Sequence, residues 1–568
     1  MERKIKMSIF DHKDYKDEKD FLENFKIDIP ENFNFGFDCV DALAETEPDR
    51  VALIWDHDED PGRSYTFAEM KAYSDGAARY FKSIGIGKGD RVMLILKRRI
   101  HFWFAILGLI KIGAIAIPAT HHLIADDIVY RNKSASVNAI VCADDDKIIK
   151  AIEAAQPESS SVSHLIRVGL AQGDYTPQYA WEKFDERIRE FMDGGRNAGA
   201  PSAQVPLPRV TENSDPLLLY FTSGTTGYPK MVVHDHTYPL AHIVTAKYWH
   251  NLHPDSIHFT LADTGWGKAV WGKLFGQWLC KATVFVYDHE KLVVSRLLKM
   301  LAKHKVTSFC APPTVYKVLL TADFTQYDLS ALEYATSAGE PLNDSVFYEF
   351  QDRTGLTIYE CYGQTETVPS VLTSPYTKPT PGSIGKANPF YKMVFLKPDG
   401  GILEGPGEGE MCLEMTPGDP GVFIGYYRNP DLTKYAWRGG VYHTGDLARV
   451  DEDGYIWFIG RTDDIIKSAG YRIGPFEVES VVQQHESVLE CAVTGVPDPI
   501  RGQAIKASII LREDYKPTDE LKKELRAFVK AHAAAYKIPR IFEFVDELPK
   551  TISGKVRRAE MREKDSVK

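Results

Sequence analysis

The sequence predicts an α/β protein with a large N-terminal domain of parallel sheets, a small β subdomain and a small α+β C-terminal domain. Short, continuous apolar runs alternate with segments of helical periodicity over most of the chain. The length of 568 residues exceeds what a single hydrophobic core organises, so several folding units are expected. After Arg461 the elements become shorter and fit a compact unit of about 100 residues.

The first predicted elements are strands at 91–97, 115–118 and 139–142, with a helix at 101–112 between the first two. Their runs are apolar throughout rather than alternating, which is typical of parallel strands that are buried on both faces. The most apolar segment, 102–118, is interrupted by a lysine and two glycines and is short for a membrane span. It is therefore predicted to be a core helix that leads into a buried strand.

The remaining chain divides by composition. Residues 156–208 are rich in Ser, Gly, Ala and Pro, so a long surface excursion is expected there. A second α/β region is predicted from 217 to 372, and the glycine- and proline-rich stretch 379–460 predicts the β subdomain. The domains are assigned as 1–462 and 463–568. The C-terminal domain is predicted to contain strands at 491–496, 505–511 and 541–545 and a helix at 520–532.

Charge and cysteine content exclude several classes of protein. The net charge of −11 (68 Lys+Arg against 79 Asp+Glu) repels polyanions, so nucleic acid is not an expected partner. The mixed charges of residues 1–25 fit neither a secretory signal nor a transit peptide. The cysteines are odd in number, form no CxxC pair and lie far from clustered histidines, which predicts reduced core thiols, no zinc site and a cytoplasmic location. They are Cys39, Cys142, Cys280, Cys310, Cys361, Cys412 and Cys491.

The strongest local motif is an apolar strand that runs into a loop of hydroxyl and glycine residues closed by a lysine. Backbone N–H groups, hydroxyls and one cation can converge there on the oxygens of a polyphosphate. The loop is not a Walker loop, because Pro229 stands where the second glycine is required, and GxGxxG is absent. Taken alone, such a loop is more often a plain turn. Its residues are Thr222, Ser223, Gly224, Thr225, Thr226, Gly227 and Lys230.

Three later segments place charged and aromatic groups at turns. Tyr362 offers a flat face for a purine, and Glu366 could coordinate magnesium together with phosphate oxygens. Asp446 suits the two hydroxyls of a ribose, and Lys555 lies on a flexible glycine loop. Taken singly, each fits turn chemistry, a solvated acid or a basic tail equally well.

Six motifs, in this order and spacing, resemble the adenylate-forming superfamily, and most closely its medium-chain acyl-CoA synthetases. The resemblance implies an AMP-forming ligase that uses ATP, Mg²⁺ and coenzyme A. A carboxylate would attack the α-phosphate to give an acyl-adenylate and diphosphate, and the CoA thiol would then displace AMP. The motifs are 222–230, 337–341, 362–366, 442–446, 460–474 and 549–555.

The resemblance also implies a role for each site residue. The 222–230 loop would hold the β- and γ-phosphates, and Lys555 would neutralise charge that grows in the adenylation transition state. The small domain would be mobile and rotate about Asp463, which would bring Gly470 to the pantetheine tunnel. The other implied roles are Gly339, Glu340 and Pro341 in the adenine pocket, Tyr362 stacked on adenine, Thr365 at the α-phosphate, Glu366 at magnesium, Asp446 and Arg461 at the ribose, and Arg472 near phosphate.

The acyl pocket is expected to exceed acetate in length. Acetyl-CoA synthetases, as the resemblance has it, carry tryptophan where this chain has Gly363. Each buried methylene contributes about 0.8 kcal/mol, which favours straight or branched acids of roughly C4 to C8, with aromatic acids included. Three tryptophans, Trp249, Trp266 and Trp271, would cap the pocket, although they fit equally well as core residues.

Two residues near the expected pocket have no assigned role from sequence. Lys268 would be costly in an apolar pocket unless it is paired or reaches water, so it is expected at the rim, facing the CoA channel or pointing away. His234 follows the phosphate loop and could line the carboxylate site, but a packed histidine fits as well.

Other functions remain open from the sequence. One alternative is an acyl- or aryl-adenylating enzyme that loads a carrier-protein thiol, and another is a CoA ligase that prefers acetate or propionate. A sensor without turnover is disfavoured, because it has no need to keep Lys555, Glu366, Asp446 and Arg461 together. The expected partners are a small carboxylate, ATP and CoA, with a homodimer left open.

Overall fold

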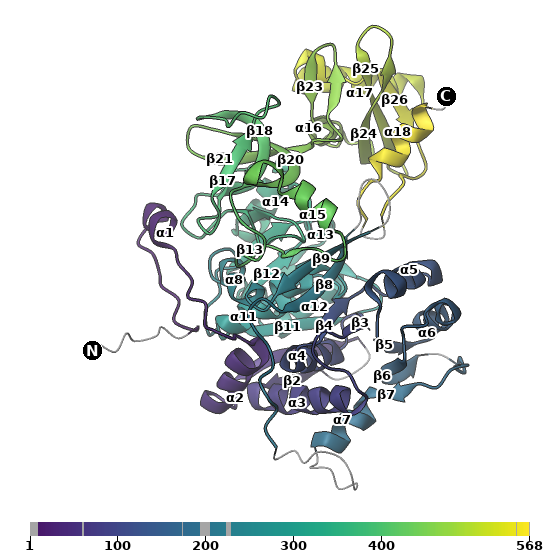
Figure 1. Ribbon diagram of the computed structural model, residues 1–568. Coiled ribbons are helices and arrows are strands. Elements are labelled where there is room, and N and C mark those ends of the chain that lie inside the picture. The colour runs from purple at the N-terminus through teal and green to yellow at the C-terminus, as the bar shows by residue number, and fades with distance from the viewer. Residues whose placement is uncertain are drawn as a thin grey trace.

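The structure, a computed structural model, describes residues 9–58, 62–172, 174–192, 205–222, 229–551 and 554–566. Their strands form three sheets, and the chain moves between the first two before it builds the third (Figure 1). The helices are α1 (Glu18–Asn24), α2 (Ala42–Thr46), α3 (Phe67–Ser83), α4 (His101–Ile112), α5 (Ala125–Ala135), α6 (Asp146–Ala155), α7 (Phe184–Met192), α8 (Tyr238–Ala241), α9 (Ile243–Ala246), α10 (Gly267–Lys273), α11 (Phe275–Leu279), α12 (Val294–Lys303), α13 (Pro313–Leu319), α14 (Asp344–Thr354), α15 (Pro430–Ala436), α16 (Pro475–Val482), α17 (Asp519–His532) and α18 (Arg558–Ser566).

The largest sheet is parallel at its centre and antiparallel toward both ends. In spatial order its strands are β17 (Met393–Leu396), β18 (Gly407–Leu413), β20 (Tyr442–Val450), β21 (Tyr455–Arg461), β16 (Gly385–Ala387), β15 (Val371–Leu372), β14 (Ile358–Tyr362), β13 (Tyr334–Ala338), β12 (Ser308–Ala311), β10 (Ile257–Thr260), β11 (Thr283–Asp288), β1 (Val51–His57) and β2 (Arg63–Thr66). The parallel run from β14 to β1 brings the carboxyl ends of its strands to one edge, where open α/β sheets bind ligands.

The second sheet confirms the prediction of parallel strands buried on both faces. In β3, Val92 and Leu94 enter the core that contains α3 and α4, whereas Met93 and Ile95 enter the core that contains α5 and α6. Successive side chains of a strand point to opposite faces, so an unbroken apolar run is required. The strands in spatial order are β19 (Gly425–Tyr426), β9 (Lys230–Asp235), β8 (Pro216–Thr222), β4 (Ile115–Pro118), β3 (Arg91–Ile95), β5 (Ala139–Asp145), β6 (His164–Gln172) and β7 (Glu182–Lys183).

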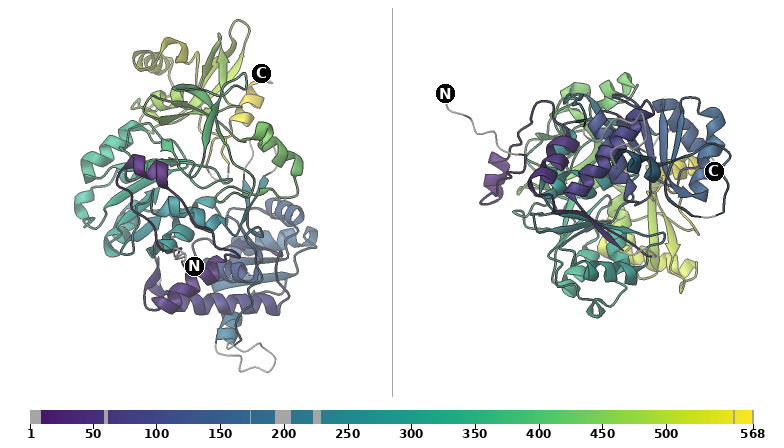
Figure 2. Two further views of the ribbon diagram at one scale, coloured as in Figure 1. Left: turned by 60° about the vertical axis from the view of Figure 1, so that its left-hand side comes forward. Right: turned by 90° about the horizontal axis from the view of Figure 1, so that it is seen from below.

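The third sheet and its helices α16, α17 and α18 form a unit that stands apart from the two larger sheets (Figure 2, left). Its strands are β22 (Ile466–Ser468), β23 (Tyr471–Ile473), β24 (Val488–Asp498), β25 (Gly502–Leu511) and β26 (Ile541–Phe544). The predicted C-terminal strands and helix correspond to β24, β25, β26 and α17, which confirms the α+β character of this region.

The structure corrects two expectations about the middle of the chain. The surface excursion predicted for 156–208 is wrong for β6, β7 and α7, because β6 pairs in parallel with β5 and buries Leu165, Ile166 and Val168. The strands of the predicted β subdomain are not isolated. They extend the largest sheet through the antiparallel pair β16 and β21, while β19 joins the second sheet through β9.

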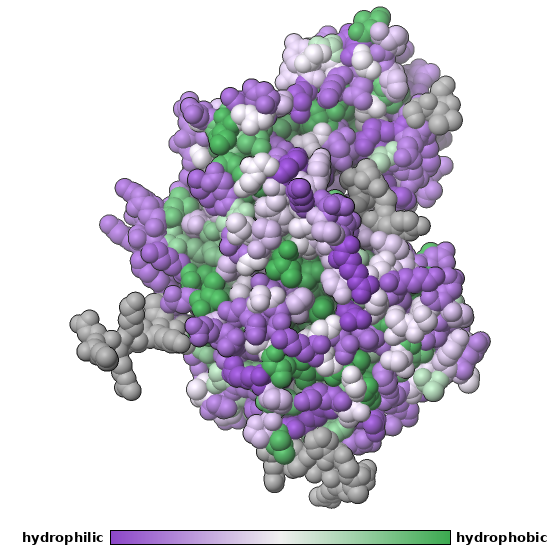
Figure 3. Space-filling view, viewed as in Figure 1, coloured by the Kyte–Doolittle hydropathy of each residue, from purple (hydrophilic) through white to green (hydrophobic). Residues whose placement is uncertain are grey.

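The molecular surface carries mostly polar side chains. The face shown in Figure 3 is largely hydrophilic, and its apolar side chains gather in small separate groups. Helix α4, which holds most of the most apolar segment, is buried and leads into β4 as predicted. Among the described residues, no helix combines the length and the apolar composition needed to cross a bilayer.

Candidate active site

The carboxyl ends of the neighbouring parallel strands β13 and β14 carry two of the predicted motifs. Ala338 and Cys361 are paired in register, so Gly339 to Pro341 and Gly363 to Glu366 leave the sheet side by side. Gly339 has φ of +102°, a conformation that glycine adopts at little cost. The two predicted motifs thus begin at the ends of neighbouring strands.

Asp446 is the centre of a buried polar cluster beside these loops. The hydroxyl of Tyr362 donates to Asp446, and Nε2 of Gln364 donates to the same carboxylate at 2.6 Å. Nη1 of Arg461 lies 3.5 Å from Oδ1 of Asp446, because β20 and β21 pair these two residues directly. Burial raises the pKa of Asp446, and the charges of Arg461 and Lys555 oppose that rise. Tyr362 and Arg461, both predicted to bind the nucleotide, therefore contact the carboxylate of Asp446.

Gln364 lies inside a recognised motif but has no role that its sequence position predicts. Its Oε1 accepts a hydrogen bond of 2.7 Å from the hydroxyl of Tyr442, while its Nε2 reaches Asp446 and the Thr444 carbonyl. Gln364 therefore orients the carboxylate that was predicted to bind ribose. Its position between two motif residues was the signal that could have found it. The ring of Tyr362 lies near Phe458, with centroids 6.2 Å apart.

Glu366 and Lys230 both lie close to Tyr426. The Tyr426 hydroxyl donates to Oε1 of Glu366 at 2.9 Å, and the Lys230 ammonium lies 5.4 Å from the centre of the Tyr426 ring. Thr222 and Lys230 are paired across β8 and β9, so both ends of the phosphate loop reach this place. Nothing in the sequence indicated Tyr426. The predicted loop residues Ser223, Gly224, Thr225, Thr226 and Gly227 lie outside the described residues.

His234 is a packed histidine rather than an acid or base. Its Nε2 lies 2.7 Å from the carbonyl oxygen of Thr365, and its ring stacks on Tyr238 with centroids 3.7 Å apart. Burial lowers the pKa of His234 to about 3, so the ring is neutral and its Nε2–H donates to the carbonyl. The histidine holds the backbone of Thr365, the residue that was predicted to meet the α-phosphate.

Gly363 lies against Trp271 of α10. A Cβ atom at position 363 would stand 2.6 Å from Cη2 of Trp271 and 3.1 Å from the Val368 carbonyl oxygen, so no side chain fits without movement. The Trp271 indole N–H donates to the Tyr238 hydroxyl at 3.1 Å, which holds the ring in place. Trp271 thus occupies the space beside the glycine.

The other predicted pocket residues do not share this contact. Trp249 is fully buried and donates to the carbonyl of Tyr359 at 3.0 Å, as a core residue does. Trp266 is half-buried and immediately precedes α10. The Lys268 ammonium donates to the Ala338 carbonyl at 2.8 Å, at the base of the predicted adenine loop.

Lys555 projects from a tight turn on the third-sheet unit. The Thr551 N–H donates to the Lys555 carbonyl at 2.8 Å, and the Gly554 N–H donates to the Thr551 carbonyl at 2.9 Å. The positive charge of Lys555 acts on the pKa values of both Glu340 and Asp446, which puts it near the adenine loop and the buried carboxylate. By contrast, Gly470 and Arg472 are exposed on the β22–β23 hairpin.

Glu360, which no sequence motif indicates, supports the predicted adenine loop from β14. Its carboxyl group is buried and accepts the Leu342 N–H at 3.1 Å. Burial raises the pKa of Glu360 to about 8, so the carboxyl is uncharged at neutral pH. A buried acid at this place braces the loop without adding charge beside a nucleotide.

Replacing Glu360 with glutamine is expected to remove a pH dependence of stability. The unfolded chain ionises this carboxyl above about 4.5 and the folded chain only above about 8, so stability falls as pH rises between these values, by at most about 1.4 kcal/mol per unit. In melting experiments from pH 5 to 8, the advantage of Glu360→Gln over the wild type should grow with pH. The exposed Glu45→Gln is the control, and an advantage that stays constant would contradict the prediction.

Comparison with known proteins identifies the family of the chain. The AMP-binding enzyme family matches residues 40–427, and the AMP-binding enzyme C-terminal domain matches residues 477–555. Acyl-coenzyme A synthetase ACSM3, mitochondrial, of Pongo abelii is 36% identical over 553 residues, 96% of this chain and 91% of that protein. Acyl-coenzyme A synthetase ACSM5, mitochondrial, of Homo sapiens is 35% identical over 547 residues, 94% and 91% of the two chains.

Solved structures show the same fold. The anthranilate CoA ligase AuaEII, in complex with anthranoyl-AMP, aligns with a TM-score of 0.83 at 27% identity, over 94% of this chain and 98% of that one. A benzoate CoA ligase from Burkholderia xenovorans LB400 aligns with a TM-score of 0.77 at 25% identity, over 93% and 100%. The chain belongs to the AMP-binding enzymes and, within them, to the medium-chain acyl-CoA synthetases, which form acyl-CoA through an acyl-adenylate.

Proposed function

We propose that this enzyme activates straight or branched carboxylic acids of roughly C4 to C8, at a gain of about 0.8 kcal/mol per buried methylene. The observation that supports the proposal is the contact of Gly363 with Trp271: position 363 lacks the tryptophan that the resemblance gives for acetyl-CoA synthetases, and the indole of Trp271 would limit the depth instead. The acid would lie between this contact and Thr365, close to Gly267. A Cβ atom added at Gly267 would stand 3.8 Å from Cγ2 of Thr365.

In the proposed complex, the nucleotide is held by residues that follow β13 and β14 and by residues of β20 and β21. Asp446 would accept hydrogen bonds from the ribose hydroxyls, with its carboxylate oriented by Tyr362, Gln364 and Arg461. Gly339, Glu340 and Pro341 would line the adenine, on the loop that Lys268 and Glu360 brace. Burial of the Asp446 carboxylate excludes water that would compete for these hydrogen bonds.

The residues around Glu366 fit a magnesium ion. Mg²⁺ prefers hard oxygen ligands and is usually held by one or two carboxylates together with substrate phosphates. Glu366 offers one carboxylate oriented by Tyr426, and Lys230 adds a cation at the same place. When bound, the ion would neutralise charge on the phosphate oxygens. Thr222 and Lys230 would hold the diphosphate that leaves.

We also propose the domain assignment 1–462 and 463–568, with Asp463 as the hinge. Strand β21 ends at Arg461 and the third sheet begins at Ile466, so the proposed hinge lies between two sheets. Nε of Arg461 lies 3.3 Å from Oδ1 of Asp463, which links the hinge to the ribose carboxylate. Rotation would withdraw Lys555 and bring Gly470 to the pantetheine tunnel for the CoA step.

The proposed location is the cytoplasm. All cysteines of the chain are unpaired and buried in the structure, which fits a reducing compartment. The names of the curated relatives place those proteins in mitochondria.

The function is tested by diphosphate release from Mg-ATP, with and without CoA, for acids from acetate to octanoate plus 2-methylbutyrate and benzoate. A maximum at an intermediate acid, with CoA-dependent AMP and acyl-CoA formation, is the expected result. Diphosphate release that CoA cannot carry forward would point to a carrier-protein thiol instead. A maximum at acetate or propionate would overturn the proposed chain length.

Asp446→Asn is expected to raise the KM for ATP about tenfold or more, because a charge-assisted hydrogen bond to the ribose is worth about 1.5–3 kcal/mol. In the wild type the KM for ATP should also rise as pH falls, since the pKa of Asp446 is raised by burial and binding needs the carboxylate. Steady-state kinetics between pH 5.5 and 8 measure both effects. The asparagine variant should lose this pH dependence, and retaining it would assign the effect to another group.

A further inference from the structure

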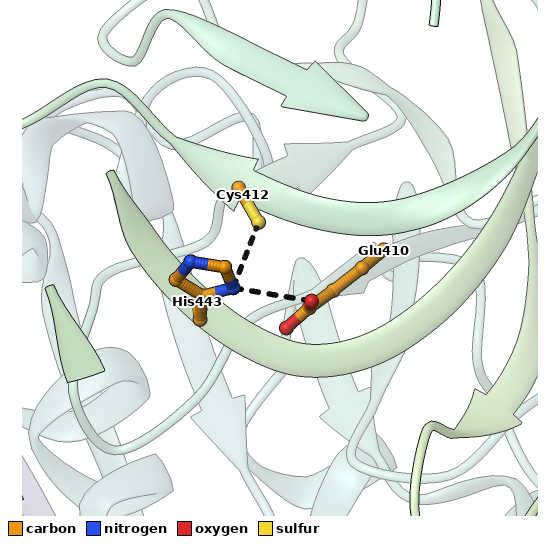
Figure 4. Close-up of side chains that lie close together, drawn as sticks. All are labelled: Glu410, Cys412 and His443. Atoms are coloured by element: carbon orange, nitrogen blue, oxygen red, sulfur yellow. Dashed lines mark hydrogen bonds and ion pairs between the residues drawn. The ribbon is translucent and has the colours of Figure 1, made fainter. Parts of the chain in front are cut away.

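A second cluster of polar side chains lies behind the nucleotide site, where β18 and β20 pair. Cys412 stands directly opposite His443 across the two strands (Figure 4). Glu410, two residues before Cys412 in β18, lies on the same face of the strand. Nδ1 of His443 lies 3.1 Å from Oε2 of Glu410 and 3.6 Å from Sγ of Cys412. The three groups offer ligand atoms that all lie within 4.8 Å of one another.

Backbone groups outside the cluster orient two of these side chains. Nε2 of His443 lies 3.1 Å from the Arg438 carbonyl oxygen, so Nε2–H donates there and Nδ1 faces the carboxylate and the sulfur. Oε1 of Glu410 accepts the Gly445 N–H at 3.1 Å, which leaves Oε2 directed at Nδ1. Such outer contacts are typical of side chains that bind a metal.

We propose that Glu410, Cys412 and His443 bind a Zn²⁺-class divalent cation, with water as the fourth ligand. Zinc bonds of about 2.3 Å to sulfur and about 2.0–2.2 Å to nitrogen and oxygen, at tetrahedral angles, separate N from S by about 3.5 Å and N from O by about 3.4 Å. The observed 3.6 Å and 3.1 Å are close to these values. Binding replaces the thiol proton, which passes to solvent, by a sulfur–metal bond.

An ion can reach this cluster from solvent. The side chains of His443 and Glu410 keep 10% and 17% of their surface exposed, so the cluster lies at the edge of the core. The Arg438 guanidinium is a competing cation: its Nη2 lies 3.9 Å from Oε2 of Glu410, its side chain is 41% exposed, and its Nη1 donates to the Tyr435 carbonyl. The cluster is therefore partly accessible from solvent.

The backbone of Gly445 links the proposed metal site to the proposed nucleotide site. Gly445, whose N–H binds Glu410, immediately precedes Asp446, and its carbonyl accepts the Thr462 N–H at 2.9 Å. A bound cation would thus brace the turn that carries the ribose carboxylate. The expectation of no zinc site was based on sequence spacing, which cannot show that Cys412 and His443 are partners across two strands.

The test uses the full-length chain after removal of metal by a chelator. Equilibrium dialysis with Zn²⁺ should give one equivalent per chain, and Co²⁺ should produce a thiolate-to-cobalt charge-transfer band in the near ultraviolet. Cys412→Ala should remove the band and weaken Zn²⁺ binding by more than about 100-fold, beyond the loss typical of an outer-shell partner. Cys142→Ala, at a buried cysteine of β5, is the matched control and should keep both signals.

The metal-free variants are first compared by circular dichroism and melting temperature. If Cys412→Ala does not fold, Cys412→Ser keeps the size of the side chain and is judged by the same band. Binding that Cys412 substitution leaves unchanged, a cobalt complex without the thiolate band, or no stoichiometric binding would each overturn the proposal.

Discussion

Replacing Lys555 with alanine is expected to reduce adenylate formation by about 100- to 1,000-fold, the cost of removing one preorganised charge from a developing transition state. The carboxylate and the α-phosphate are both anionic, so their approach requires a cation between them. Lys555 is placed for this role by the turn of Thr551 and Gly554, and its charge acts on both Glu340 and Asp446. Diphosphate release with a saturating acid measures the loss.

The second half-reaction separates this role from a general loss of structure. If the small domain rotates before the CoA step, Lys555→Ala should still convert a supplied acyl-adenylate and CoA to thioester. Lys550→Ala is the matched control from the same segment, because its ammonium pairs with Glu490 at 2.7 Å. That variant should keep both half-reactions. Equal loss of both in Lys555→Ala would contradict the two-conformation account.

Gly363→Trp is expected to move the preference of the enzyme toward acetate. The position has no room even for a Cβ atom, which would stand 2.6 Å from Trp271, so a second indole must fill the acyl space or displace the first. Each methylene that loses its place costs about 0.8 kcal/mol, or about fourfold in kcat/KM, and three methylenes cost about 60-fold. The ratio of kcat/KM for pentanoate to that for acetate, two acids that differ by three methylenes, measures the change.

A compensating variant tests whether volume is the cause. Gly363→Trp combined with Trp271→Gly restores the total size of the two side chains and should return part of the activity with longer acids. Melting curves show whether the single variant is folded. An unchanged chain-length profile in Gly363→Trp would mean that Gly363 does not border the acyl site.

The local elements were accessible from the sequence because they depend on local patterns. The predicted helix at 101–112 matches α4, since its apolar residues are buried and Gly113 ends it with φ of +72°. The error at β6 has the opposite origin. The composition of 156–208 resembles a loop, yet Leu165, Ile166 and Val168 are buried, because β6 pairs with the edge of β5.

The chemistry of the site was likewise partly accessible. Tyr362, Asp446, Arg461 and Glu366 carry charges or rings in recognisable motifs, and the structure brings the first three together. The supporting residues have no such signature. Tyr426 orients Glu366 from a strand pair on the second sheet, so only the packing of the two sheets shows its role.

The sequence by itself determined the α/β class, several of the strands and helices, the chemical groups of the motifs and the family to which they belong, because these depend on residue type and short-range spacing. Only the tertiary structure decided which strands are neighbours, that Trp271 lies against Gly363, that Lys268 holds the Ala338 carbonyl and that Cys412 meets His443. The physical reason is that backbone hydrogen bonds between strands join residues far apart in the chain. Which partners they join depends on how the whole core packs.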